Sequence, residues 1–142
     1  MQFNVFKQTA ACLTLVLFAG ACAHAEAVVV VSSRSAVGSL SSNQVAQIFL
    51  GKSVSFPNGE AAVALDVSEA GLKSEFYRKV TGKDASQLKS YWAQLIFTGQ
   101  ARPPRSVSDS AEARRIIASN PGMIGYISRD AVDSSVKVVL SP

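Results

Sequence analysis

Four consecutive valines, Val28 to Val31, place the strongest constraint on how this chain folds. A strand with one face in water alternates apolar and polar residues. Four β-branched apolar residues in a row are instead typical of a strand that is buried on both faces. The run therefore predicts a strand in the interior of a sheet rather than at its edge.

The rest of the chain alternates between helical and extended patterns, which predicts an α/β fold with a mostly parallel central sheet flanked by about four helices. Turn and cap residues separate the expected elements. In chain order these are a helix that starts at Ser41 or Ser42 and stops at Gly51, a strand at 61–65, a helix capped by Ser68, a helix that ends near Gly99, a helix at 110–120, and two strands, "GMIGYIS" and "VKVVL".

Apolar spacing predicts which helical residues face the core. Leu72, Phe76 and Val80 recur every four residues and should form one buried stripe. The next helix is expected to bury Leu88, Tyr91, Trp92, Leu95 and Ile96. Tyr91 and Trp92 are core residues on this interpretation, and a stacking platform for a ligand is the alternative.

Residues 1–25 are expected to be a signal peptide, which leaves a single domain at 26–142. Lys7 precedes an apolar run that is too short to span a bilayer, and Ala23-His24-Ala25 has the small-x-small cleavage pattern. Ala19-Gly20-Ala21-Cys22 offers a second cut, after which Cys22 would carry a lipid. Both readings predict a periplasmic protein, either soluble or anchored through Cys22.

Removing this segment limits the chemistry of the domain. Cys12, Cys22 and His24 are the chain's two cysteines and one histidine, so none remains for a zinc site or for a Cys–His or Ser–His nucleophile. Without Lys7, 13 of the 14 basic residues face 10 acidic ones, too small an excess for a nucleic-acid surface. We therefore expect no enzyme activity, no cofactor and no nucleic-acid partner.

Three segments follow the "VVVV" run in order: "LSSNQVAQIFLGK", "FPNGEAAVALDVSEAGLKSEF" and "NPGMIGYIS". Together with that run they resemble the phosphate-type solute-binding proteins of bacterial ABC transporters. The resemblance covers nearly all of residues 27–140. It implies one lobe of the two-lobed periplasmic-binding-protein fold. It also implies phosphate or another small anion as the solute, and a membrane transporter or sensor as the partner.

The family's Gly-Ser-Gly-Thr loop aligns with Glu69, Ala70, Gly71 and Leu72, where only Gly71 agrees. The family's arginine falls on Asp66. Phosphate is bound by arginine, hydroxyl and backbone donors, so these replacements predict that tight phosphate binding is lost.

Two interpretations of Ser68 to Gly71 remain open. The segment is either a helix start with Glu69 placed favourably in the helix dipole, or a modified ligand site for a polar or cationic solute. Asp66 is either exposed at the end of its strand or paired with Lys73 or Arg78.

Ser33 and Arg34 follow the valine strand, at the kind of strand end where α/β sheets open their crevices. Arg34 is the candidate cation for an anion, with a solvated loop arginine as the alternative. The predicted ligand site thus comprises Ser33, Arg34, Ser68, Glu69, Ala70 and Gly71. The connection Arg102-Pro103-Pro104-Arg105 is either a partner contact or a stiff linker.

Two functions are compatible with these patterns. The first is a binding module that delivers or reports a small solute to a membrane partner. The second is an accessory or sensor module that keeps the lobe and has lost ligand binding, with a homo-oligomer as one form of it. A polar cleft would favour the first, and an exposed apolar patch or a cleft filled by the protein's own side chains would favour the second.

Overall fold

A computed structural model of the chain describes residues 26–142. The expected signal peptide, with Cys22 and both cleavage patterns, lies outside the described residues. The elements are β1 (Ala27–Ser32), α1 (Ser42–Phe49), β2 (Val63–Val67), α2 (Ala70–Thr81), α3 (Ala85–Phe97), β3 (Arg105–Val107), α4 (Ser110–Ser119), β4 (Met123–Ser128), a short 3-10 helix (Arg129–Ala131) and β5 (Val136–Leu140).

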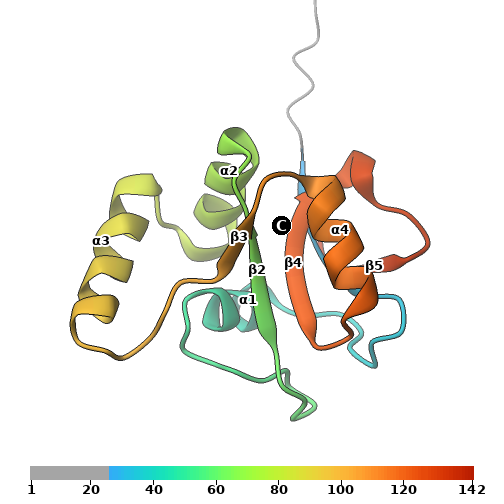
Figure 1. Cartoon of the computed structure of the whole chain (residues 1–142), viewed down its shortest axis with the longest axis horizontal. Coiled ribbons are helices and arrows are strands. Elements are labelled where there is room, and N and C mark those ends of the chain that lie inside the picture. The colour runs from blue at the N-terminus through green and yellow to red at the C-terminus, as the bar shows by residue number, and fades with distance from the viewer. Residues whose placement is uncertain (1–25) are drawn as a thin grey trace, which may run out of the picture.

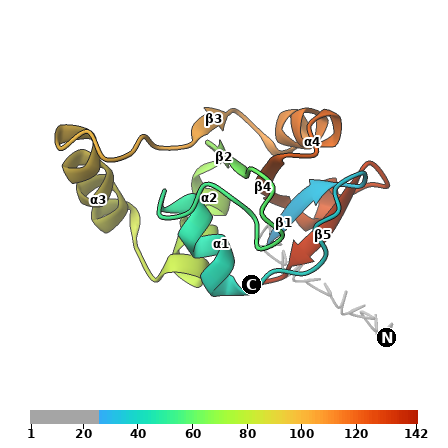
Figure 2. The same cartoon turned by 90° about the horizontal axis from the view of Figure 1, so that it is seen from below.

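The five strands form one mixed sheet in the order β3-β2-β4-β1-β5 (Figures 1 and 2). β2 is parallel to both β3 and β4, whereas β1 is antiparallel to both β4 and β5. The α/β class and the four helices are confirmed, with three of the helices against the sheet. The sheet is less parallel than expected, because apolar periodicity predicts that a strand exists but carries no information on its direction.

Helices cover both faces of this sheet (Figure 2). α4 packs on one face against β4, β1 and β2, and α1 and α2 pack on the other face. β1 lies between two strands and under both layers, so every one of its residues is buried. The interior strand predicted from the valine run is confirmed.

The helix ends follow the local chemistry with one exception. Ser41 caps α1 in a capping box with Gln44, as its position before an apolar run predicts. α2 instead starts after Glu69, whose side chain makes no capping hydrogen bond. The prediction of Ser68 as the cap of α2 is therefore wrong by one residue, because Ser68 is held by β3, as described below.

α3 projects from the body of the molecule in both ribbon views (Figures 1 and 2). Leu88 and Trp92 turn inward and are buried, as predicted, and Tyr91 donates a hydrogen bond of 2.6 Å to the Leu50 carbonyl. Ile96 was expected in the core but is 54% exposed. It lies at the far end of the projecting helix, where no layer covers it.

An aromatic cluster fills the space between the helices and the sheet. Phe76 of α2 stacks on Tyr126 of β4 with ring centroids 4.0 Å apart, and meets Phe49 of α1 at 4.8 Å and Tyr77 at 5.0 Å. The four rings are at most 2% exposed. They join α1, α2 and the sheet into one core.

Gly125 allows a close approach between α4 and the sheet. A Cβ atom at this position in β4 would lie 2.6 Å from Cδ1 of the buried Ile117 and 3.2 Å from the Leu65 carbonyl oxygen. We expect Gly125→Ala to lower the free energy of unfolding by about 2 kcal/mol through overpacking. Urea denaturation measures this, with Gly38→Ala as the control because a Cβ at Gly38 meets nothing within 4 Å. Equal stability of the two variants would contradict the expected overpacking.

Candidate functional site

The edge of the sheet where β2 leads into α2, and β3 leads through a short turn into α4, is the place for the predicted anion site. Because β2 and β3 are parallel, their carboxyl ends lie together. The Ser68 and Ser106 hydroxyl oxygens are 2.7 Å apart, and the Ser68 N–H donates to the Val107 carbonyl at 2.8 Å. Ser68 thus connects the two strand ends instead of capping α2.

Glu69 reaches across this edge to the neighbouring helix. Its Oε1 accepts a hydrogen bond of 3.3 Å from the backbone N–H of Ser110, the first residue of α4. The N-terminus of a helix attracts negative charge and can bind a free anion. Here a carboxylate of the protein itself takes that place.

Two more carboxylates crowd the same end of α4. Asp109 caps the helix by accepting from the Glu112 N–H at 2.8 Å. Glu112 accepts from the Ser108 hydroxyl at 2.8 Å and from its N–H at 3.1 Å, and these hydrogen bonds lower the pKa of Glu112. A free anion at this helix end would meet three like charges, counting Glu69.

Asp66, in the position aligned with the family's arginine, lies inside the protein. The residue is 5% exposed, and its carboxylate is 2.9 Å from the Lys73 ammonium. It accepts hydrogen bonds from the Tyr126 hydroxyl and, at 3.2 Å, from the Val67 N–H. Of the readings for Asp66, pairing with Lys73 is confirmed and exposure at the strand end is wrong. Its partners leave it poorly placed to hold a cationic solute.

Burial raises the pKa of Tyr126 and of Tyr77 well above the ordinary range, and the negative charge of Asp66 raises both further. The Tyr77 hydroxyl is buried beside this network without a hydrogen bond of normal geometry to any residue from 26 to 142. Burial also raises the pKa of Tyr91, the third tyrosine.

Alkaline titration tests whether the tyrosine hydroxyl groups are buried in this way. A free tyrosine ionises near pH 10, so the unfolded chain releases these protons before the folded protein does. The stability due to the raised pKa values is therefore complete below about pH 10 and is lost as the pH rises above it. We expect tyrosinate absorbance to appear together with unfolding, measured by circular dichroism. Ionisation of all three tyrosines near pH 10 in a protein that remains folded would contradict this.

Ser33 and Arg34 lie at the opposite end of the strands from Ser68 to Gly71. β1 is antiparallel to β4 and β4 is parallel to β2, so the carboxyl ends of β1 and β2 point in opposite directions. Arg34 donates to the Ala118 carbonyl at 3.4 Å near the end of α4, whereas Glu69 contacts the first residue of that helix. The expectation that both groups line one cleft is wrong, because the sequence did not reveal the direction of β1.

The two groups are separated by most of the length of α4. That helix has 10 residues, which corresponds to about 15 Å. Gly71 is exposed in the first turn of α2, and Ala70 is the first residue of that helix. A ligand role for any of the six residues stays a prediction.

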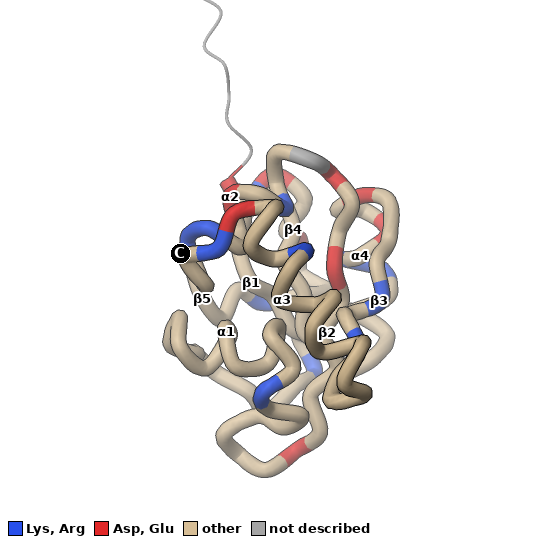
Figure 3. The backbone as a smooth tube through the Cα atoms, turned by 90° about the vertical axis from the view of Figure 1, so that its left-hand side faces the viewer, with Lys and Arg blue, Asp and Glu red and all other residues tan. Residues whose placement is uncertain are grey.

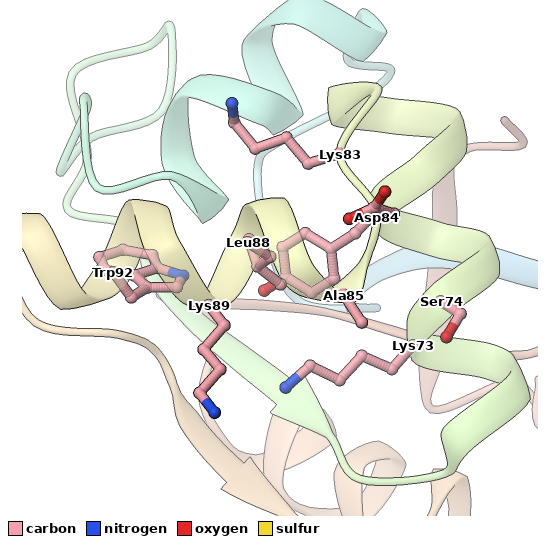
Figure 4. A pocket seen from close by; sticks show the side chains of 9 residues that line it. Lys73, Ser74, Lys83, Asp84, Ala85, Leu88, Lys89 and Trp92 are labelled. Atoms are coloured by element: carbon pink, nitrogen blue, oxygen red, sulfur yellow. The ribbon is translucent and has the colours of Figure 1, made fainter.

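The sequence did not predict the pocket between α2 and α3 (Figure 4), although Trp92, the alternative stacking platform, lines it. Its volume is about 350 Å³. It is lined by Lys73, Ser74, Tyr77, Lys83, Asp84, Ala85, Leu88, Lys89 and Trp92. The sequence does show Lys73, Lys83 and Lys89 near the apolar residues Leu88 and Trp92. Only the relative position of the two helices brings these side chains to one cavity.

The connection Arg102 to Arg105 borders a second pocket of about 270 Å³, together with Val54, Val63 and Trp92. Arg105, the last residue of this connection, starts β3, a strand that the sequence did not predict. Val54 and Val63 are 78% and 54% exposed. A partner contact there stays a prediction.

Within residues 26–142, no group of three or more His, Cys, Asp or Glu residues could hold a metal ion. In the same part of the chain, no helix has the length and apolar character needed to cross a membrane.

No protein-family model and no curated protein matches the chain. Solved structures do. A phosphate ABC transporter substrate-binding protein from Clostridium perfringens with bound phosphate aligns with a TM-score of 0.64 and 21% identity over 80% of this chain. An ABC-type phosphate transport receptor from Vibrio cholerae aligns with a TM-score of 0.62 and 18% identity. PstS from Borrelia burgdorferi aligns with a TM-score of 0.57 and 12% identity, and both alignments cover 80% of this chain.

The matched region covers 44–46% of each of these three proteins, so the chain spans less than half their length. The likeness confirms the fold read from the sequence, a lobe of the periplasmic-binding-protein type. The neighbours are phosphate ABC transporter substrate-binding proteins, as the resemblance of the three sequence segments predicted.

Proposed function

We propose that this chain is an exported, non-catalytic module of the solute-binding type in which the protein's own carboxylates close the anion site expected where the carboxyl ends of β2 and β3 meet the start of α4. The observation that carries the proposal is the hydrogen bond from the Ser110 N–H to Glu69, with Asp109 and Glu112 at the same helix end. The solute-binding fold of the structural neighbours supports a binding module rather than an enzyme.

The proposed setting is the periplasm. Residues 1–25 have the pattern of an export signal, and Cys22 offers a lipid anchor as the alternative form. The partner would be a membrane transporter or sensor, as for proteins that share the fold. A single lobe buries a solute less completely than two lobes that close around it, so a partner or a second copy would complete the site.

Titration calorimetry with phosphate at low salt tests the closed site. We expect no saturable heat up to about 1 mM phosphate, because an incoming anion meets Glu69, Asp109 and Glu112. Sulfate is the matched anion, and a two-lobed phosphate-binding protein in the same buffer is the positive control. A phosphate dissociation constant in the micromolar range would contradict the proposal.

The second candidate function is an accessory module that acts through protein contacts and no longer binds a solute. The filled helix end favours it, and so do exposed apolar side chains on the projecting α3, where Phe97 is 92% and Ile96 is 54% exposed. α3 carries one charged residue, Lys89, and its tube is mostly uncharged in Figure 3.

Analytical ultracentrifugation of the wild type and of Phe97→Ser tests self-association through this end of α3. A dimer that dissociates more readily in the variant supports the accessory function. A protein that stays monomeric at every concentration would show that the accessory function does not act through self-association.

A further inference from the structure

We propose that the pocket between α2 and α3 binds a small organic anion with a flat apolar body. The residues that line this pocket include neither Ser68 to Gly71 nor the start of α4, so the proposal goes beyond the function above and does not require phosphate. Its parts are an apolar floor, a basic rim and a cavity of about 350 Å³, within the range of small-molecule sites.

The floor consists of Tyr77, Leu88 and Trp92, which are 2%, 7% and 8% exposed. Tyr91 packs edge-on against Trp92 with ring centroids 5.3 Å apart. The Tyr91 hydroxyl donates a hydrogen bond to the carbonyl of Leu50, the residue that follows α1. The Trp92 ring is therefore held in place before any ligand arrives. An aromatic ligand that covers the remaining exposed part of these side chains gains ring contacts and some apolar burial.

The rim is basic. Lys73, Lys83 and Lys89 line the pocket against one acidic residue, Asp84. The Asp84 carboxylate caps α3 by accepting from the Gln87 N–H at 2.8 Å, which uses part of its hydrogen-bonding capacity. The rim therefore favours a ligand with a negative charge.

Lys89 is the best placed of the three lysines to bind the anionic group. Lys73 already pairs with Asp66 at 2.9 Å, and the Lys83 ammonium lies 5.2 Å from the centre of the Tyr91 ring. Lys89 makes no ion pair with another of the described residues. In Figure 4 the ammonium groups of Lys73 and Lys89 lie on the same side of the pocket, whereas Lys83 points to the other side.

Both parts of the ligand follow from this arrangement. Inorganic phosphate would contact the lysines but leave the apolar floor to water. A neutral aromatic compound would cover the floor but leave the ammonium groups without a partner. An aryl or short alkyl phosphate, sulfonate or carboxylate satisfies both through charge-assisted hydrogen bonds and apolar burial.

Phenyl phosphate is the probe, and Trp92 is a built-in reporter because it is the chain's one tryptophan and lines the pocket. We expect phenyl phosphate to change the tryptophan fluorescence of the purified protein saturably. Inorganic phosphate and phenol should each bind at least about tenfold more weakly. Equal binding of phosphate or of phenol, or no saturable change, would overturn the proposal.

Two variants locate the site. Lys89→Gln should weaken phenyl phosphate binding about tenfold, because it removes a charge-assisted hydrogen bond. Ala85→Phe should block the cavity, since Ala85 is exposed on its lining. Lys52→Gln is the matched control, an equal loss of charge at an exposed residue outside the pocket lining. Equal weakening by Lys52→Gln, or unchanged binding in Lys89→Gln, would show that the pocket is not the site.

Circular dichroism of each variant shows whether its fold is intact. The outcome is also separable from that of the closed phosphate site. Phosphate binding that persists in Lys89→Gln and Ala85→Phe would contradict the closed site and leave this pocket unaffected. Failure of phenyl phosphate to bind would overturn the proposal for this pocket and leave the proposal of the closed phosphate site unaffected.

Discussion

Replacing Phe76 with alanine should lower the free energy of unfolding by about 4 kcal/mol, the largest effect we expect from a single substitution in this protein. Phe76 has no exposed surface. Its ring stacks on Tyr126 at 4.0 Å with the ring planes 12° apart, and it contacts Phe49 and Tyr77 edge-on. Truncation leaves a cavity at the point where α1, α2 and the sheet meet, and it removes ring pairs that add to the burial of apolar area.

Urea denaturation monitored by circular dichroism measures this loss. Phe97→Ala is the matched control, since Phe97 is the same residue type at 92% exposure and its truncation should change stability by less than about 0.5 kcal/mol. A loss below about 1.5 kcal/mol for Phe76→Ala would mean that the core collapses around the missing ring or that the aromatic cluster is looser than the structure shows.

The second large effect concerns Asp66. We expect Asp66→Ala to cost about 3 kcal/mol, because it leaves the buried Tyr126 hydroxyl and the Val67 N–H without this acceptor and also breaks the pair with Lys73. Lys73→Ala should cost about 1 kcal/mol or less, since the Lys73 side chain is 40% exposed and the pair is partly screened by water.

Asp66→Asn separates the two contributions. It keeps a side-chain oxygen for the Tyr126 hydroxyl and removes the negative charge, so its cost should fall between those of the other two variants. Chemical denaturation of all three proteins is the measurement, with Glu60→Ala as an exposed acidic control. Equal losses for Asp66→Ala and Lys73→Ala would show that the ion pair, and not the buried hydrogen bonds, makes the contribution.

These contacts give a physical reason for the acidic residue aligned with the family's arginine. An arginine at position 66 would place a second cation beside Lys73 and present no acceptor to the Tyr126 hydroxyl. The carboxylate instead contributes to the core here. A change at one position alone would therefore destabilise the protein before it could create a phosphate site.

The sequence alone determined the main helices and strands of this fold, with β3 as the exception, and much of its core. The valine run predicted the interior strand β1, and the spacing of Leu72, Phe76 and Val80 predicted the buried face of α2. Cap and turn residues placed α1 and α4 to within a residue or two. Such features depend on neighbours within a few positions along the chain, so periodicity and capping chemistry are sufficient to read them.

The tertiary structure alone decided the candidate sites. The direction of β1 separates Arg34 from Ser68, the position of α4 brings Ser110 to Glu69, and the position of α3 beside α2 brings Lys89 and Trp92 to the same pocket as Lys73. Each of these depends on strand order and helix packing between residues far apart in sequence. Local patterns do not encode such contacts, because the same strand can pair in either direction and the same helix can pack at several angles.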